Sequence, residues 1–349
     1  MKRSLTRTLI FVLMTVLVIV FVAACGADTK DKNDVKEEEV KDEVTDKEDA
    51  TEKDEADSPE KEDEEDVAVS EDEKIVVGFS ISTLNNPFFV DLKEAAQEIA
   101  DENNVDFIVL DAGDDTTKQL ADVEDLVQQE VDVIIVNPTD SDAIVSAVEA
   151  ANDANIPVIA IDRSSNGGVI TSYIASDNIK GGELAGEFIV EALAGTGKVI
   201  EIEGLPGTSP ARDRGEGFHN IVDAEDGIEV LVSQPADFDR AQGLTLMENL
   251  LQAHPEIDAI FALNDEMALG ALEAIQASGR EIIIVGFDAT DDGLVAIKNG
   301  DMSATIAEQS KLMGRTGMEV AIEIAKGETV DEEIQLDVAL VTLDNVDDY

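Results

Sequence analysis

From residue 75 onward, short apolar runs alternate with amphipathic stretches of helical spacing, which is the pattern of strands and helices taken in turn. Most of the apolar runs lack polar alternation, as parallel strands covered on both faces do. This alternation predicts α/β units with right-handed crossovers. We therefore expect an α/β fold of two similar, doubly wound parallel-sheet lobes that meet near residues 176–178.

The expected strands form two sets of five, one set for each lobe, followed by one further apolar run. That last run, 334–341, is expected to be an extra strand near the junction of the lobes. The first set covers 75–81, 105–110, 131–136, 157–161 and 170–175, and the second covers 198–203, 228–233, 258–263, 282–287 and 303–307.

The first 25 residues have the pattern of a secretory signal. Basic residues at the start precede a largely apolar run over 9–24, which is short for a membrane span, and small residues precede Cys25. This end resembles a bacterial lipobox, which implies that Cys25 is lipidated and becomes the mature N-terminus. The alternative is a chance cysteine in an ordinary signal peptide. Because Cys25 is the only cysteine, the chain has no intramolecular disulfide, cysteine-based zinc site or cysteine nucleophile.

Residues 26–74 carry 24 acidic and 8 basic residues and almost no large apolar side chain. Such a segment buries too little apolar surface to offset its chain entropy, so we predict a disordered acidic tether. An acidic interaction tail is the alternative. The chain from residue 75 onward has a net charge of −42, which argues against nucleic acid or anionic lipid as its partner.

Two classes of site have no sequence support. Neither G-x-G-x-x-G after a strand nor G-x-x-x-x-G-K-[ST] occurs, so we expect no nucleotide cofactor. His219 and His254 are the only histidines and neither has a paired ligand nearby, so we expect neither a metal site nor a Ser-His-Asp triad.

Polar and aromatic side chains gather just past the carboxyl ends of the expected strands, where open α/β sheets bind ligands. Two facing lobes would bring these loops into one cleft. Phenyl rings suit the C–H faces of a sugar, while carboxylates, guanidinium groups and amides can satisfy its hydroxyls. The candidate residues are Ser82, Asn86, Phe88, Phe89, Asn137, Asp162, Arg163, Arg214, Phe238, Asn264, Phe287 and Asp288.

Several candidates also have a purely structural interpretation. The asparagines could cap helices, as Asn86 before Pro87 and Asn264 before Asp265 suggest. Asp162 and Arg163 could form a surface ion pair, and Phe287 could belong to the core. The occurrence of the whole set at the strand ends favours a binding site.

From residue 75 to about 341, the chain resembles the D-ribose-binding group of periplasmic sugar-binding proteins, a pentose/hexose family related to LacI-type sugar-sensing domains. The resemblance lies in segments 82–89, 137–143, 174–178, 215–218, 233–240 and 264–272. It implies the periplasmic binding protein type I fold with a three-segment hinge. The N-terminal lobe would comprise 75–176 and 309–337, and the C-terminal lobe 177–308 and 338–349. The chain would cross between them near Asp177, Glu308 and Asp337.

The resemblance also implies that the twelve candidates contact ribose. The family has a glutamine at the position of Glu308, and this departure puts one hydroxyl contact in doubt. An ionised carboxylate accepts hydrogen bonds but does not donate them, so the affinity or the sugar preference can differ.

These inferences predict a lipid-anchored extracytoplasmic receptor that passes D-ribose to an ABC permease and its ATPase. We expect a monomer that is not an enzyme and has no cofactor. Allose, another pentose or a furanosyl signal molecule remain alternative ligands, and a chemoreceptor remains an open partner. A glycosidase using Asp162 and Asp288 is disfavoured because neighbouring guanidinium groups should keep both carboxylates ionised. A LacI-type regulator would need a DNA-binding segment where the signal and tether stand.

Overall fold

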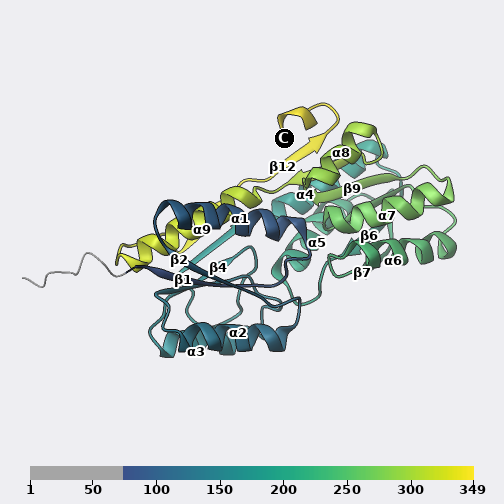
Figure 1. Ribbon diagram of the computed structural model, residues 1–349. Coiled ribbons are helices and arrows are strands. Elements are labelled where there is room, and N and C mark those ends of the chain that lie inside the picture. Colours follow the sequence, from purple (N-terminus) through teal and green to yellow (C-terminus); the bar gives the residue numbers. More distant parts are fainter. Residues whose placement is uncertain (1–73) are drawn as a thin grey trace, which may run out of the picture. The chain divides into compact units, whose positions relative to one another are not determined.

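The computed structural model describes residues 74–349, so Cys25, the signal pattern and almost all of the acidic tether lie outside the described residues. The described residues belong to one contact unit that contains two six-stranded sheets (Figure 1). The expected α/β fold with two parallel-sheet lobes is confirmed. Within residues 74–349, no helix combines the length and apolarity that crossing a membrane requires.

The first sheet is entirely parallel, with the order β11-β5-β4-β3-β1-β2. Helices α1 and α9 cover one face and α2 and α3 the other (Figure 1). Its strands are β1 (Val76–Ile81), β2 (Asp106–Asp111), β3 (Val133–Val136), β4 (Val158–Ile161), β5 (Ser172–Ser176) and β11 (Glu333–Leu336). Its helices are α1 (Pro87–Glu102), α2 (Thr116–Gln128), α3 (Val145–Asp153) and α9 (Ser310–Ala325).

The second sheet has the order β12-β10-β9-β8-β6-β7, and only β12 runs antiparallel to its neighbour. Helix α4 packs against α5, and α6 packs against α7. Its strands are β6 (Gly197–Glu203), β7 (Ile228–Pro235), β8 (Ala259–Ala262), β9 (Ile283–Asp288), β10 (Ala304–Ala307) and β12 (Ala339–Thr342). Its helices are α4 (Asn178–Ala192), α5 (Ser209–Val222), α6 (Arg240–Ala253), α7 (Asp265–Ser278), α8 (Asp291–Asn299) and the 3₁₀ turn η1 (Val346–Asp348).

The expectation of one strand over 334–341 is wrong, because the structure divides this run between the two sheets. β11 pairs in parallel with β5, and β12 pairs antiparallel with β10. The chain passes from one sheet to the other at Asp337 and Val338. The chain also crosses between β5 and α4 and between β10 and α9, which gives three connections between the lobes.

Burial on both faces explains the apolar strands. All four residues of β3, of β4 and of β8 are buried, as parallel strands between two helical layers should be. Two helices that follow strand ends begin at side-chain caps: for α1, Asn86 accepts a hydrogen bond from Phe88 N at 2.9 Å, and for α7, Asn264 accepts one from Met267 N at 2.9 Å. The loops between strand ends and helix starts are thereby fixed at the edge where the two lobes face each other.

The loop after β9 is held by the buried carboxylate of Asp265. This carboxylate accepts hydrogen bonds from Thr290 N at 2.8 Å, Thr290 Oγ1 at 3.1 Å and Thr305 Oγ1 at 2.7 Å. Burial raises the pKa of Asp265 to about 7, although these donors oppose the shift. Asp265 therefore connects α7, β10 and the loop that follows Asp288.

Candidate functional site

A cavity lies between the lobes, at the carboxyl ends of the strands, and the space in it that no atom fills is about 260 Å³, open solvent included. The loops after β1 and β4 form its wall on the first lobe, and α5 with the loops after β7, β8, β9 and β10 forms the opposite wall. Ten sequence-predicted residues line it: Asn86, Phe88, Phe89, Asp162, Arg163, Arg214, Phe238, Asn264, Asp288 and Glu308.

Three of the lining residues have backbones with positive φ angles. Asp162, just after β4, has φ 64°, Phe238 has φ 59°, and Asp288 at the end of β9 has φ 104°. Residues other than glycine rarely adopt positive φ angles, and such backbone conformations concentrate at functional sites. The surrounding hydrogen bonds must therefore hold these turns against their own backbone preference.

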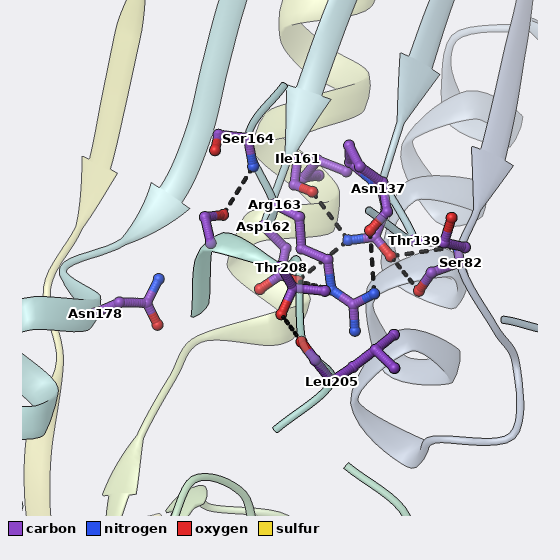
Figure 2. Close-up of polar contacts among 12 residues, drawn as sticks. Ser82, Asn137, Thr139, Ile161, Asp162, Arg163, Ser164, Asn178, Leu205 and Thr208 are labelled. Atoms are coloured by element: carbon purple, nitrogen blue, oxygen red, sulfur yellow. Dashed lines mark hydrogen bonds and ion pairs between the residues drawn. The ribbon is translucent and has the colours of Figure 1, made fainter. Parts of the chain in front are cut away.

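Asn137 and Ser82 form a buried layer behind Asp162 (Figure 2). Asn137 does not cap a helix. Its Oδ1 accepts from Ser82 Oγ at 2.6 Å, and its Nδ2 donates to Ile161 O and to Asp162 Oδ2, each at 3.1 Å. Both residues are fully buried and neither lines the cavity. Their observed role is to orient Asp162, and a direct sugar contact from either stays a prediction.

Arg163 lies inside the cleft and not at the surface. Its exposed fraction is 3%, and its Nε is 3.6 Å from Asp162 Oδ2, so the alternative of a surface ion pair is wrong. The guanidinium carbon lies 5.1 Å from the ring centre of Phe89 and 5.7 Å from that of Phe238. Its Nη1 donates to Pro138 O at 3.1 Å. Two phenyl rings from different lobes thus face one guanidinium.

Arg214 of α5 is held by four polar partners from four different segments. Its Nε donates to Asn178 Oδ1 at 2.7 Å, and Nη1 donates to Leu263 O at 2.8 Å. Nη1 also lies 3.3 Å from Asp288 Oδ1, and Nη2 donates to Glu308 Oε2 at 2.8 Å. These contacts fix the planar guanidinium in one orientation at the cavity wall.

Phe287 lies beneath Arg214 and does not line the cavity. The guanidinium carbon is 3.8 Å from the centre of its ring, which is fully buried in the core of the second lobe. The core interpretation of Phe287 therefore describes its position, and its predicted sugar contact stays a prediction. Helix α4 can approach α5 at this point because Gly182 has no side chain: a Cβ there would lie 2.0 Å from Arg214 O.

Burial and ion pairing act against each other on the pKa values of the carboxylates of the cavity. Burial raises the pKa of Asp162, of Glu308 and, most strongly, of Asp288, although Arg163 and Arg214 act in the opposite direction. Desolvation and the guanidinium groups therefore act in opposite directions on Asp162 and Asp288, and the expectation that both carboxylates are ionised stays a prediction. For Arg214, burial lowers the pKa, but Glu308, Asp288 and Asp162 together raise it above its usual value.

Two contributors were missed by sequence reasoning. Pro210 in the first turn of α5 lines the cavity, and Asn178 at the start of α4 orients Arg214. Asn178 follows the first lobe crossing, within the segment that carries the family resemblance, but its position near a helix start predicts a cap. Pro210 has no polar signal, because a proline in the first helical turn is common for structural reasons alone.

The cavity combines flat apolar rings with a dense set of acceptors and forked donors. Phe88 and Phe89 meet edge to face with ring centres 5.3 Å apart, beside the amide of Asn86. This arrangement suits a small neutral polyol, whose hydroxyls need partners and whose C–H faces need apolar contact. Among residues 74–349, no group of three or more histidine, cysteine or acidic side chains is arranged to hold a metal ion.

Comparison with known proteins gives a consistent set of relatives. Residues 77–329 match the family described as periplasmic binding protein domain. The chain is 50% identical over 270 residues to the ribose import binding protein RbsB of Bacillus subtilis, covering 77% of this chain and 88% of the relative. It is 48% identical over 276 residues to the Escherichia coli protein of the same name, covering 79% and 93%.

A solved structure of an ABC transporter solute-binding protein from Bacillus halodurans with bound myo-inositol has a similar fold. Its TM-score is 0.76 at 39% identity, and the match covers 79% of this chain and 97% of that one.

Proposed function

The chain belongs to the periplasmic binding protein family as a sugar-binding component of an ABC transporter, and we propose that the sugar it captures is D-ribose. The prediction that it is not an enzyme is confirmed by its relatives, which are import binding proteins. The observation that carries the ribose proposal is the cavity itself: two arginines, three carboxylates and three phenyl rings around a space for one small polyol. The 50% identity to a ribose import binding protein supports the same sugar.

In this proposal, both lobes contact the sugar through charged hydrogen bonds and stacked phenyl rings. Asp162 and Arg163 would bind its hydroxyls from the first lobe, and Arg214 and Asp288 from the second. Phe88, Phe89 and Phe238 would cover its C–H faces. Because the sugar touches both lobes only when they are closed, it favours closure by its differential affinity for that state. A permease with its ATPase would then receive the sugar from the closed receptor.

The lobes also contact each other beside the cavity, which supports closure as the binding-competent state. Ser141 N donates to Gly207 O at 3.0 Å, and Ser164 N donates to Ser209 Oγ at 2.9 Å. Ser141 and Ser164 belong to the first lobe, while Gly207 and Ser209 lie where β6 leads into α5. Gly207 has φ 92°, and a Cβ on it would lie 2.1 Å from Asp140 Oδ2. We name this contact between 140–141 with 164 and 207–209 the side clasp.

The second part of the proposal concerns location. The signal pattern, the lipobox-like end and the acidic segment together support an extracytoplasmic protein tethered to the cell membrane through Cys25. In that arrangement the acidic segment separates the binding lobes from the bilayer surface.

Calorimetric titration of the purified full chain with D-ribose, D-allose, L-arabinose and myo-inositol tests the sugar. D-ribose is expected to bind at least about tenfold more tightly than the others, because a sugar with a missing or misplaced hydroxyl leaves a buried charged group unpaired. Tighter binding of another sugar in this panel would overturn the ribose assignment and leave the transport family unchanged.

Replacing Asp288→Asn is expected to weaken ribose binding by at least about 2 kcal/mol, or roughly 30-fold. The sugar then loses the carboxylate acceptor that Arg214 holds in place, while Arg214 keeps Glu308 as its charged partner. Asparagine tolerates the positive φ of this position better than alanine does, so folding is preserved. The matched control is Asp291→Asn, an exposed acid three residues further on, which should bind as the wild type does. Near wild-type affinity of Asp288→Asn would contradict the assignment.

Gly207→Ala tests the side clasp. The new methyl group clashes with Asp140 only when the lobes are closed, so the ribose dissociation constant should rise by about tenfold or more. Gly195→Ala is the matched control, because Gly195 has φ 74° and open space around it. Both variants should lose a similar amount of thermal stability from backbone strain, about 1 kcal/mol. Equal ribose affinities in the two variants would remove the side clasp from the closing mechanism.

Cys25→Ser tests the lipid anchor in cells that express the full chain. The wild type should sediment with membranes, since each buried acyl CH₂ contributes about 0.8 kcal/mol, and the variant should not. Purified variant protein should keep the wild-type ribose affinity. If the variant sediments with membranes as fully as the wild type, Cys25 does not carry the anchor.

A further inference from the structure

The cavity between the lobes holds more buried negative charge than positive charge. Three carboxylates, Asp162, Asp288 and Glu308, face two guanidinium groups, Arg163 and Arg214, and none of the five residues is more than 7% exposed. With every group ionised, the closed site carries a net charge of −1. An uncompensated charge out of water is unfavourable enough that a buried group takes up or releases a proton instead.

The surplus can be located on one pair of side chains. Asp162 has its own partners, Arg163 at 3.6 Å and the amide of Asn137 at 3.1 Å. Asp288 and Glu308 share one guanidinium, since Arg214 Nη1 lies 3.3 Å from Asp288 and Nη2 lies 2.8 Å from Glu308. One guanidinium compensates one carboxylate, so this pair has one negative charge too many.

No other described cation supplies the balance. The acid Asp265 of α7 lies behind Asp288 and makes its surroundings more negative, while Asp162 acts on both carboxylates from the first lobe. Asp114 faces Arg163 and competes for its charge. Arg240, at the mouth of the cleft, is held by Glu266 at 2.5 Å and by Asp292 at 2.9 Å.

One atom of the pair is suited to carry a proton. Glu308 Oε2 accepts from Arg214, but Glu308 Oε1 is buried and has no hydrogen-bond partner of good geometry among the described residues. The hydroxyl oxygen of Ser176 on β5 is likewise buried without such a partner, and as a donor it lowers the pKa of Glu308 and so opposes the effect of burial. A protonated Oε1 could donate to an oxygen, whereas a bare carboxylate there can only accept.

We propose that the cleft binds two ligands together, a neutral sugar and one proton, and that Asp288 and Glu308 hold this proton around Arg214 when the lobes close. The proposal rests on the proposed function, because a neutral sugar brings no charge of its own. In an open cleft, water solvates the carboxylates and no proton is needed. Closing removes the water, and the proton restores neutrality.

The direction of the pH dependence follows from burial. Burial raises the pKa of Asp288 and of Glu308 above their usual range in the closed site. A group whose pKa rises on closing takes up a proton on closing, so sugar affinity is greatest at low pH. It falls as the pH rises from the ordinary carboxyl range, about 4, to the raised value in the closed state, by up to about tenfold for each pH unit.

Calorimetric titration of the full chain with D-ribose, in two buffers of different ionisation enthalpy at each pH from 5 to 9, measures the protons taken up. The wild type should take up close to one proton per sugar within part of this range, and its dissociation constant should rise with pH there. Glu308→Gln keeps the shape of the side chain and removes the surplus charge. This variant should bind ribose with little proton uptake and with a dissociation constant that is nearly independent of pH.

The matched control is Glu201→Gln, a buried glutamate of β6 that contacts His219 and does not line the cavity. Its proton uptake on binding should equal that of the wild type. Ribose binding without proton uptake by the wild type at every pH would overturn this inference and leave the ribose assignment intact. Undiminished proton uptake by Glu308→Gln would also overturn it. If no sugar of the panel binds, the ribose proposal and the proton inference both fall.

Discussion

The site depends on the hydrogen bonds that the buried guanidinium of Arg214 makes. The guanidinium joins the start of α4 at Asn178, the end of β8 at Leu263, Asp288 after β9 and Glu308 after β10. These segments are far apart in the sequence, and each would otherwise leave a polar group without a partner in a dry cleft. Below this plane Phe287 supplies an apolar surface, and Gly182 allows α4 to come close enough for the contact. The strand order of the second sheet and the glycine at the contact between α4 and α5 therefore both help to hold the side chain of Arg214.

Three residues that line the cavity have backbone conformations that non-glycine residues rarely adopt. Asp162 and Asp288 both leave their strands with positive φ, and Phe238 does so in the loop after β7. Each of these turns directs a side chain into the cavity that a regular backbone would direct elsewhere. The turn at Asp162 is supported by Asn137 and Ser82, and the turn at Asp288 by Asp265 and Arg214. A buried layer of polar residues is therefore needed behind the residues that line the cleft.

The sequence was sufficient for the lobes and for most of the cavity lining, because both follow from periodicity and strand direction. Parallel strands place their carboxyl ends at one edge, so within each sheet the polar residues after neighbouring strands had to come together. Which of these residues line the cavity and which lie one layer behind it could not be predicted from the sequence. Ser82 and Asn137 follow their strands directly, as Asp162 does, and only packing places them one layer back. Phe287 is the penultimate residue of β9, so its side chain points to the opposite face of the strand from Asp288.

Two other misjudgements have a common physical cause. The run 334–341 is continuous in hydrophobicity although it pairs with two different sheets, and Asp162 beside Arg163 suggests an ion pair at the surface although the fold buries both residues. In both cases the local pattern is correct, and the outcome is decided by what the rest of the fold places around it. Strand pairing and desolvation are long-range properties, and neither is written in a short stretch of sequence.

The position of Glu308 links the charge of the site to the movement of the lobes. It is the first residue of the connection from β10 to α9, so its backbone lies at a crossing while its side chain lies against Arg214. Asp177 and Asp337 stand at the other two crossings, but neither lines the cavity. Opening the lobes would therefore change the solvation of Glu308 at the hinge itself. The charge of the Glu308 carboxylate therefore acts both on closure of the lobes and on recognition of the sugar. In the proposal above, a proton shared with Asp288 neutralises the surplus charge in the closed state.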